Sequence, residues 1–420
     1  MSRFLCATCL ALILIRPAHA QESEPLSLAA VRTLALMHQP LLKAQGSAVA
    51  AARQSAIVAG QLPDPVLSGG LTDLTVTGAD RYTLRNESDT QFQVGIKQQF
   101  PGGDKRKLRG LRAGHIAEGL DAELEESRRM VARESSIDWV DVWRALRAQT
   151  VIQESINQAK LQEQTALIAY TNNRASQAEV LAARVAVELL NDQLSGFQQM
   201  EWHARNQIRR WIGDAAERPL QMTLPDWPAP NLEQLLTHLA GHPHVRIQSA
   251  AVEAAKTSLD LAQADYSPDW SLMAGYGYRP AYADYASIGF EIGLPFFTAN
   301  RQDRGVAAAS SQLEEANEKR EDWLKQHRAE ISLNVSDWSR LQERLTRYDT
   351  VILPQAQSRL DAALAAYSAG QGSLMSVLDA RRSLLDIRMQ RLDLEADSAR
   401  HQINLSYFNH DDSAVSGDQP

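Results

Sequence analysis

The feature that most constrains the fold of this chain is an internal repeat that divides it into two halves. When the sequence is displaced by 203 positions, Pro40 falls on Pro243, and several neighbouring residues coincide without a gap. At a displacement of 197 positions, residues 166–184 (ALIAYTNNRASQAEVLAAR) fall on residues 363–381 (ALAAYSAGQGSLMSVLDAR). The repeating unit is about two hundred residues long, which is too long for a solenoid repeat. We therefore expect one structure that has been duplicated.

The two halves share one predicted order of elements: a helix rich in alanine, two strands, and a long helical hairpin. In the first half these segments are residues 27–60, about 66–77 with 90–100, and 104–170 with 176–213. In the second half they are residues 231–265, 270–279 with 286–295, and 302–368 with 373–408. Because a proline inside a helix removes a backbone hydrogen bond, Pro354 should kink the third long helix.

The repeat also sets the expected domain boundaries. They are a signal peptide at 1–20, a first structural repeat at 21–223, a proline-rich linker (LPDWPAP) at 224–230, a second structural repeat at 231–410, and a disordered tail at 411–420.

The predicted leader contains both cysteines, which limits the chemical groups available in the processed chain. Its apolar stretch, FLCATCLALILI, is too short to span a bilayer, and Ala18-His19-Ala20 has the small-x-small pattern of a cleavage site. Both cysteines, Cys6 and Cys9, lie inside it. The processed chain would therefore have no disulfide, no thiolate metal site and no cysteine nucleophile.

The charge balance excludes one class of partner. The formal net charge is −8 at pH 7, and loss of Arg3 and Arg16 with the leader would make it −10. So acidic a chain is not expected to bind nucleic acid.

The hairpin segments carry the heptad spacing of coiled coils, with apolar residues at alternating intervals of three and four. The seam is Val180, Ala183, Val187, Leu190, Leu194 and Phe197 in the first half, and Val377, Ala380, Leu384 and Ile387 in the second. A helix over residues 104–170 would be about 100 Å long, far longer than a globular domain needs. These helices should therefore carry the chain over a distance greater than the size of a globular domain.

Some of the strand segments are apolar on one face, as lipid-facing strands are. The predicted lipid-facing residues are Phe92, Val94, Ile96, Ile288, Phe290 and Ile292. Open strand edges are not tolerated in lipid, so four strands require completion by other copies. Three copies would supply twelve strands, an even number able to close.

The expected fold class is therefore mainly α with a small β part. Long coiled-coil hairpins would form a periplasmic α-barrel, and four strands per chain would contribute to a twelve-stranded trimeric transmembrane β-barrel.

Over essentially its whole processed length, the sequence resembles the TolC-like outer-membrane efflux proteins. The stretches that carry the resemblance are GQLPDPVLSGGL (60–71), QQFPGGDKRKLR (98–109) and the paired hairpin motifs YTNNRASQAEVLAAR and YSAGQGSLMSVLDAR. The PDP and FPGG elements look most like the branch that serves heavy-metal pumps of the resistance-nodulation-division class.

The resemblance implies a homotrimeric exit duct in the outer membrane of a Gram-negative bacterium, extending into the periplasm. Its expected partners are further copies of itself, outer-membrane lipid, a periplasmic adaptor and an inner-membrane resistance-nodulation-division pump. The expected substrate is heavy-metal ions. A multidrug or type I secretion duct of the same fold is one alternative, and a secreted or surface coiled-coil scaffold or adhesin without a pore is another.

The resemblance also points to a gate at the periplasmic hairpin tips. Asp379 matches one carboxylate of the closed aperture, and Ser376 replaces the other. Glu179 and Tyr367 match a carboxylate–tyrosine latch between neighbouring coils. Gly372 stands where some members have a latching arginine, so gating here is expected to rest on fewer bonds.

No catalytic motif is found, so the chain is not expected to be an enzyme or to need a cofactor. His238, His242 and His244 are the residues most like a metal site, but Gly241 and Pro243 break the helix that would align them, and no metal site is expected.

A basic run follows the second strand of the first half. Its members are Lys105, Arg106, Lys107, Arg109 and Arg112. Positive charge near a helix start opposes the helix dipole, which favours contact with lipid phosphates over a merely solvated helix face.

Overall fold

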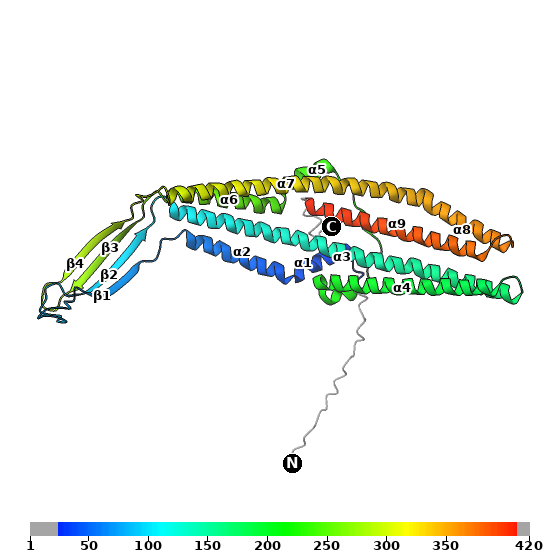
Figure 1. Cartoon of the computed structure of the whole chain (residues 1–420), viewed down its shortest axis with the longest axis horizontal. Helices are drawn as coiled ribbons and strands as arrows, with labels where there is room; N and C mark the ends of the chain where they lie inside the picture. Colours follow the sequence, from blue (N-terminus) through cyan, green and yellow to red (C-terminus); the bar gives the residue numbers. More distant parts are fainter. Residues whose placement is uncertain (1–23, 410–420) are drawn as a thin grey trace, which may run out of the picture.

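The structure is a computed structural model and describes residues 24–409. The predicted signal peptide and the whole of the predicted tail lie outside the described residues. The molecule is long and thin, with a four-stranded sheet at one end and the turns of two helical hairpins at the other (Figure 1).

Both halves contain the elements in the predicted order. The first half consists of α1 (Leu28–His38), α2 (Pro40–Ala59), β1 (Val66–Thr72), β2 (Gln91–Phe100), α3 (Lys105–Thr171), α4 (Gln177–Ile212) and the 3₁₀ turn η1 (Gly213–Glu217). The second consists of α5 (Leu232–His238), η2 (Leu239–Gly241), α6 (Pro243–Ala264), β3 (Trp270–Tyr278), β4 (Tyr285–Ile292), α7 (Gln302–Arg347), η3 (Tyr348–Ile352), α8 (Leu353–Ser368) and α9 (Leu374–Phe408). Residues 224–230 form no helix or strand.

The single helices expected at 27–60 and 231–265 are each divided, so that prediction is wrong. Proline is the first residue of both α2 and α6, and the residue before it, Gln39 or His242, has extended backbone angles. A residue before proline is pushed away from the helical region, which separates α1 from α2 and the short α5 from α6.

The four strands form one antiparallel sheet in the order β1-β2-β3-β4. Val94 pairs with Tyr276, and Ala274 pairs with both Ile96 and Ile288. Because paired residues share a face, the apolar residues of β2, β3 and β4 form one continuous exposed surface. The other face carries glycine, serine and glutamine, with an ion pair between Lys97 and Glu291. β1 and β4 are the edge strands.

The long helix α3 is the axis of the first half and the centre of the core. Both of its tryptophans, Trp139 and Trp143, are buried, and their indole N–H groups donate to the backbone carbonyls of Leu26 at 2.9 Å and Met222 at 3.0 Å. Around them pack α1, the end of α4 and α9. This core lies halfway along the molecule and holds the two halves together.

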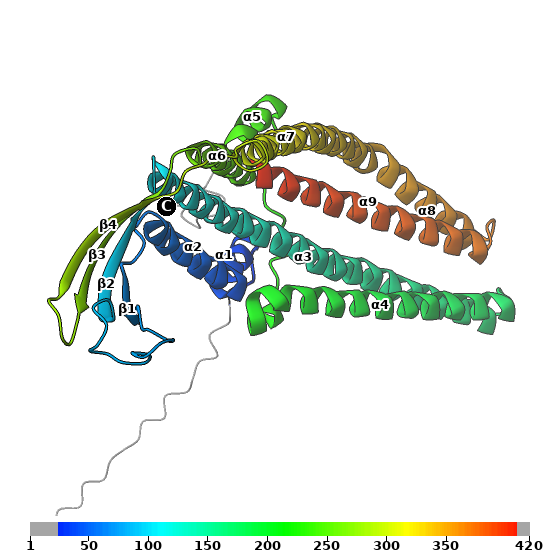
Figure 2. The ribbon, with the colours of Figure 1, turned by 60° about the vertical axis from the view of Figure 1, so that its left-hand side comes forward.

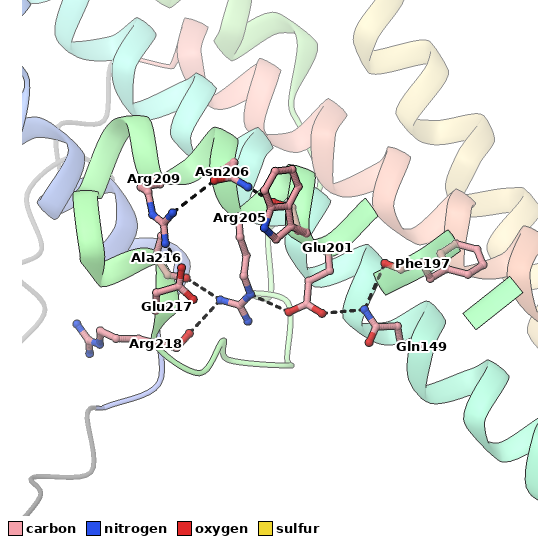
Figure 3. A network of polar contacts seen from close by, with 10 residues as sticks. Gln149, Phe197, Glu201, Arg205, Asn206, Arg209, Ala216, Glu217 and Arg218 are labelled. Carbon is pink, nitrogen blue, oxygen red and sulfur yellow. Dashed lines mark hydrogen bonds and ion pairs between the residues drawn. The ribbon is translucent and has the colours of Figure 1, made fainter. Parts of the chain in front are cut away.

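A polar network holds the end of α4 against α3 and η1 (Figure 3). Arg205 is ion-paired to Glu201 at 2.7 Å and donates to the carbonyls of Ala216 and Arg218. Gln149 of α3 donates to the same Glu201 at 2.8 Å. These bonds satisfy carbonyl groups where α4 ends, and they fix the chain before it enters the linker.

The third long helix is interrupted as expected. The five residues of η3 form a π-helix between α7 and α8, and Pro354 is the second residue of α8. Asp349 in this turn is ion-paired to Arg391 of α9 at 2.6 Å, which ties the two helices of the hairpin together. The corresponding part of α3 is regular helix.

The two hairpins, α3 with α4 and α8 with α9, are separate pairs that run in the same direction away from the curved sheet (Figure 2). In the part of the chain that the structure describes, no helix has an apolar stretch long enough to cross a membrane.

Candidate functional site

The candidate site lies at the two hairpin turns, at the end of the molecule farthest from the sheet (Figure 1). Asn173 and Gly370 occupy the same repeat position in the two turns and both have positive φ, 59° and 71°. Glycine tolerates this conformation and asparagine is among the few others that do. Both turns therefore reverse the chain by the same backbone geometry.

In the first turn, Glu179 caps its own helix. The Ser176 side chain accepts from the Glu179 N–H at 3.3 Å, and the Glu179 carboxylate accepts from the Ser176 N–H at 2.9 Å. This is a capping box at the start of α4. One oxygen of the predicted latch carboxylate is thus engaged within its own hairpin.

In the second turn, Ser373 caps α9, and the predicted gate residue Ser376 bonds locally. Its hydroxyl donates to the Ser373 carbonyl at 2.7 Å. Gly372 is tightly packed, because a Cβ there would lie 3.1 Å from the Ala366 methyl group and from the Tyr367 nitrogen. A latching arginine at position 372 would therefore require this turn to rearrange.

Tyr367 lies between the two hairpins. Its ring packs against Val180 and Leu374 in one cluster and against Leu360 and Val377 in another. Burial, and then the negative charge of Glu179, raise the pKa of the Tyr367 phenol. The structure thus brings the predicted latch pair close together within one chain, without a direct hydrogen bond between them among the described residues. The latch stays a prediction.

Asp379 is exposed and lines a cavity of about 520 Å³ between α4 and α9. The wall from α4 is apolar and includes Leu181, Val185 and Leu189, each more than half exposed. The wall from α9 is charged, with Asp386 and three arginines besides Asp379. Asp379 lies on the second turn of α9, close to the hairpin turn, and its role at an aperture stays a prediction.

Sequence reasoning missed Arg381, two residues from Asp379. Its guanidinium reaches across to α3 and donates to Gln158 Oε1 at 2.7 Å, which ties the two hairpins together. The signal was present in the repeat, because Arg184 holds the equivalent position and forms an ion pair with Glu163 of α3 at 3.0 Å.

The three histidines lie about halfway along the molecule, where His242 is buried and His238 and His244 are partly exposed. His242 is 1% exposed and caps α6, since its Nδ1 accepts from the His244 N–H, while its Nε2 faces the Tyr407 carbonyl at 3.2 Å. Burial, followed by the charge of Arg129, lowers the His242 pKa to about 3. Among residues 24–409, no cluster of three or more histidine and acidic residues is arranged to bind a metal.

Lys105 differs from the rest of the basic run. It is 6% exposed and forms an ion pair with Asp269 at 2.8 Å. Burial opposes ionisation of Asp269, but hydrogen bonds from Lys105 and the Gly102 N–H lower its pKa. Contact with lipid is therefore excluded for Lys105, whereas the side chains of Arg106, Lys107, Arg109 and Arg112 are exposed.

Comparison with known proteins agrees with this architecture. Residues 236–407, most of the second half, match the family model described as "Outer membrane efflux protein". This match places residues 236–407 in the outer membrane efflux protein family. An efflux channel transports and does not catalyse covalent chemistry, so membership of this family confirms that the protein is not an enzyme.

Several solved structures share the fold of nearly the whole chain. CusC superposes with a TM-score of 0.78 at 18% identity, covering 91% of this chain and 92% of CusC. The outer membrane protein VceC of Vibrio cholerae gives 0.76 at 20% identity, with coverages of 92% and 95%. The CmeC outer membrane channel of Campylobacter jejuni gives 0.76 at 14% identity, with coverages of 91% and 85%. No curated protein sequence matches the chain.

These findings confirm the predicted fold class: long helical hairpins joined to four strands, as in TolC-like channels. The first half, which the family model leaves unmatched, has the same order of elements as the second.

Proposed function

We propose that this protein is the outer-membrane exit duct of a tripartite efflux system and works as a homotrimer. The observation that carries the proposal is the open four-stranded sheet, whose edge strands β1 and β4 have no partner among the described residues. An open edge in lipid would leave backbone groups unsatisfied at a cost of several kcal/mol each. Three copies joined edge to edge would remove every open edge.

The position of the sheet supports a duct that crosses the periplasm. The exposed apolar face includes Ile288 at 85% and Phe290 at 79%, as expected for lipid contact. From the other end of the sheet, α3 runs for 67 residues, about 100 Å, and places the hairpin tips far from the membrane. We infer that the tips face a periplasmic adaptor and an inner-membrane pump of the resistance-nodulation-division class.

For the substrate we propose heavy-metal ions, on the resemblance of the PDP and FPGG stretches to the branch that serves metal pumps. The metal would be cargo that passes through the duct. A strain that lacks the protein should become sensitive to one or more of copper, silver, zinc, cobalt, nickel and cadmium. Unchanged metal tolerance with raised sensitivity to organic drugs or dyes would assign the duct to a multidrug pump.

The trimer and its location are tested by membrane fractionation followed by semi-native gel electrophoresis. A species of about three times the chain mass in the outer-membrane fraction is expected. A soluble monomer would contradict the duct and favour a secreted coiled-coil scaffold.

A further inference from the structure

The chain contains two junctions where a strand leads into a long helix, and the first is complete within one copy. Lys105, the first residue of α3, donates to Asp269 at 2.8 Å and to the Ser267 carbonyl at 2.9 Å. Asp269 also accepts from the Gly102 N–H at 2.8 Å. The start of a long helix in the first half is thereby bound to the segment that leads into β3 of the second half.

The second junction, at the start of α7, lacks such a partner within residues 24–409. Gln302, the first residue of α7, has a buried Oε1 without a hydrogen-bond partner. The flanking Arg301 and Arg304 are exposed and form no ion pair within the same residues. Asp303, the other charged residue of this turn, is hydrogen-bonded to Tyr266 at 2.6 Å. The junction therefore keeps an excess of positive charge and an unsatisfied polar group.

The complementary group is found at the opposite edge of the sheet. Asp64 follows Pro63 just before β1, as Asp269 follows Pro268 just before β3. Asp269 is bound to Lys105, whereas Asp64 is exposed and has no hydrogen bond or ion pair in the part of the chain that is described. Each half thus has a Pro-Asp pair close to the start of its first strand, with Asp64 two residues before β1 and Asp269 directly before β3, and among the described residues the second carboxylate alone is paired.

The helices beside the two junctions, α6 and α2, also differ in burial. Ala250 and Thr257 of α6 are buried, and Ala250 lies beside Gly119 of α3. Displaced by 203 positions, these residues correspond to Ser47 and Gln54 of α2, and both are exposed. The side of α6 that carries Ala250 and Thr257 is therefore covered, whereas the corresponding side of α2 is exposed to solvent in a single copy.

We propose that in the assembled ring Asp64 of one copy binds the start of α7 in the next copy, against Gln302, Arg301 and Arg304. The occupant of this surface is a second copy of the chain, because the contact repeats the one that Lys105 and Asp269 make within a copy. Asp64 accepts hydrogen bonds from the guanidinium groups of Arg301 and Arg304, and α2 lies along α7 as α6 lies along α3. This inference rests on the proposed ring assembly.

Cysteine cross-linking tests the contact directly, because both natural cysteines lie in the predicted leader. Trimeric protein that carries Asp64→Cys and Arg304→Cys is treated in membranes with a short bismaleimide. Bands of two and three chain masses on a denaturing gel are expected. Each single variant should give the monomer alone, and so should Asp64→Cys with Arg106→Cys, which places the second thiol at the start of α3.

A charge-reversal cycle tests whether the groups attract one another. Asp64→Arg, and separately Arg301→Glu with Arg304→Glu, should each reduce the trimer about two- to fivefold per junction, the range of partly exposed ion pairs. All three changes together should restore it. If the wild-type protein forms a trimer but the cysteine pair gives no intersubunit link and the triple charge variant is not rescued, the proposed contact is wrong and the proposed duct is unaffected. A wild-type protein that forms no trimer overturns both.

Discussion

At the scale of single residues, Asp379 is the side chain whose charge should matter most for transport. It is exposed at the tip and lines the cavity between α4 and α9. Three Asp379 carboxylates, one from each copy of the chain, would repel anions and attract cations at the narrow end of the duct. Asp379→Ala should leave the trimer intact, weaken cation selectivity, and weaken block by divalent or trivalent cations in planar-bilayer recordings.

Asp386→Ala is the matched control, because Asp386 lines the same cavity about two helical turns farther from the tip. Wild-type selectivity and block in the Asp379→Ala channel would show that this carboxylate does not line the aperture.

A second residue-scale effect is acid sensitivity caused by His242. Its pKa of about 3 lies below the ordinary value of 6.5, so the unfolded chain binds the proton more strongly. The stability it supports is complete above about pH 6.5 and falls as the pH drops toward 3, by at most about 1.4 kcal/mol per pH unit and site. Burial raises the pKa of neighbouring Glu126, which acts in the opposite sense.

His242→Asn should therefore make the melting temperature less dependent on pH between 6.5 and 4.5, while an asparagine still caps α6. Thermal unfolding in detergent at several pH values measures this slope. The cavity left by the substitution lowers the stability of the variant by a similar amount at every pH, so the slope and not the absolute value decides. An unchanged slope would show that His242 does not control acid sensitivity.

Some of these roles could be read from the sequence and some could not. Ser176 with Glu179 three residues later is a capping-box pattern, so the local role of Glu179 was predictable from spacing alone. The burial of Lys105 was not, because its partner Asp269 lies 164 residues away in the other repeat. Nor was the buried contact of His242 with Tyr407, which joins α6 to the end of the chain.

At the scale of elements, strand periodicity predicted the sheet better than composition predicted the short helices. Alternation identified the exposed apolar face of β2 and β4, and the register confirms that their apolar residues share it. The divided helices were mispredicted although Pro40 and Pro243 coincide in the repeat. Each proline stands at the first turn of a helix, where it is tolerated, so an alanine-rich stretch around it resembles one continuous helix.

The apolar face of β4 gives an element-scale prediction. Phe290→Arg would place a charge in hydrocarbon, at a cost of about 2–4 kcal/mol per chain near the bilayer midplane. Three copies multiply this cost, so the amount of trimer in the outer membrane should fall strongly. Ser287→Arg is the matched control, because Ser287 lies on the opposite face of the same strand. Normal levels of the Phe290→Arg protein would contradict lipid contact at this face.

At the scale of the whole molecule, the duplication explains why a single copy looks incomplete. The first long helix, α3, has buried side chains along most of its length, because α2 and α6 pack on both of its sides. Its counterpart α7 has just Ala309, Ile331 and Leu341 buried. The two helices occupy the same place in the two repeats, so we infer that α7 lacks a neighbour in a single copy, which the proposed ring would supply in α2 of the next copy.

This asymmetry gives a prediction that separates assembly from folding. Gln54→Trp adds bulk to the side of α2 that corresponds to the buried side of α6 at Thr257, where overpacking costs about 1–3 kcal/mol at each of three contacts. The variant chain should keep wild-type helix content by circular dichroism but yield much less trimer on semi-native gels. Ala50→Trp is the control, because its counterpart on α6, Glu253, is exposed. Equal trimer yields from the two variants would show that α2 does not meet α7 of another copy through this side.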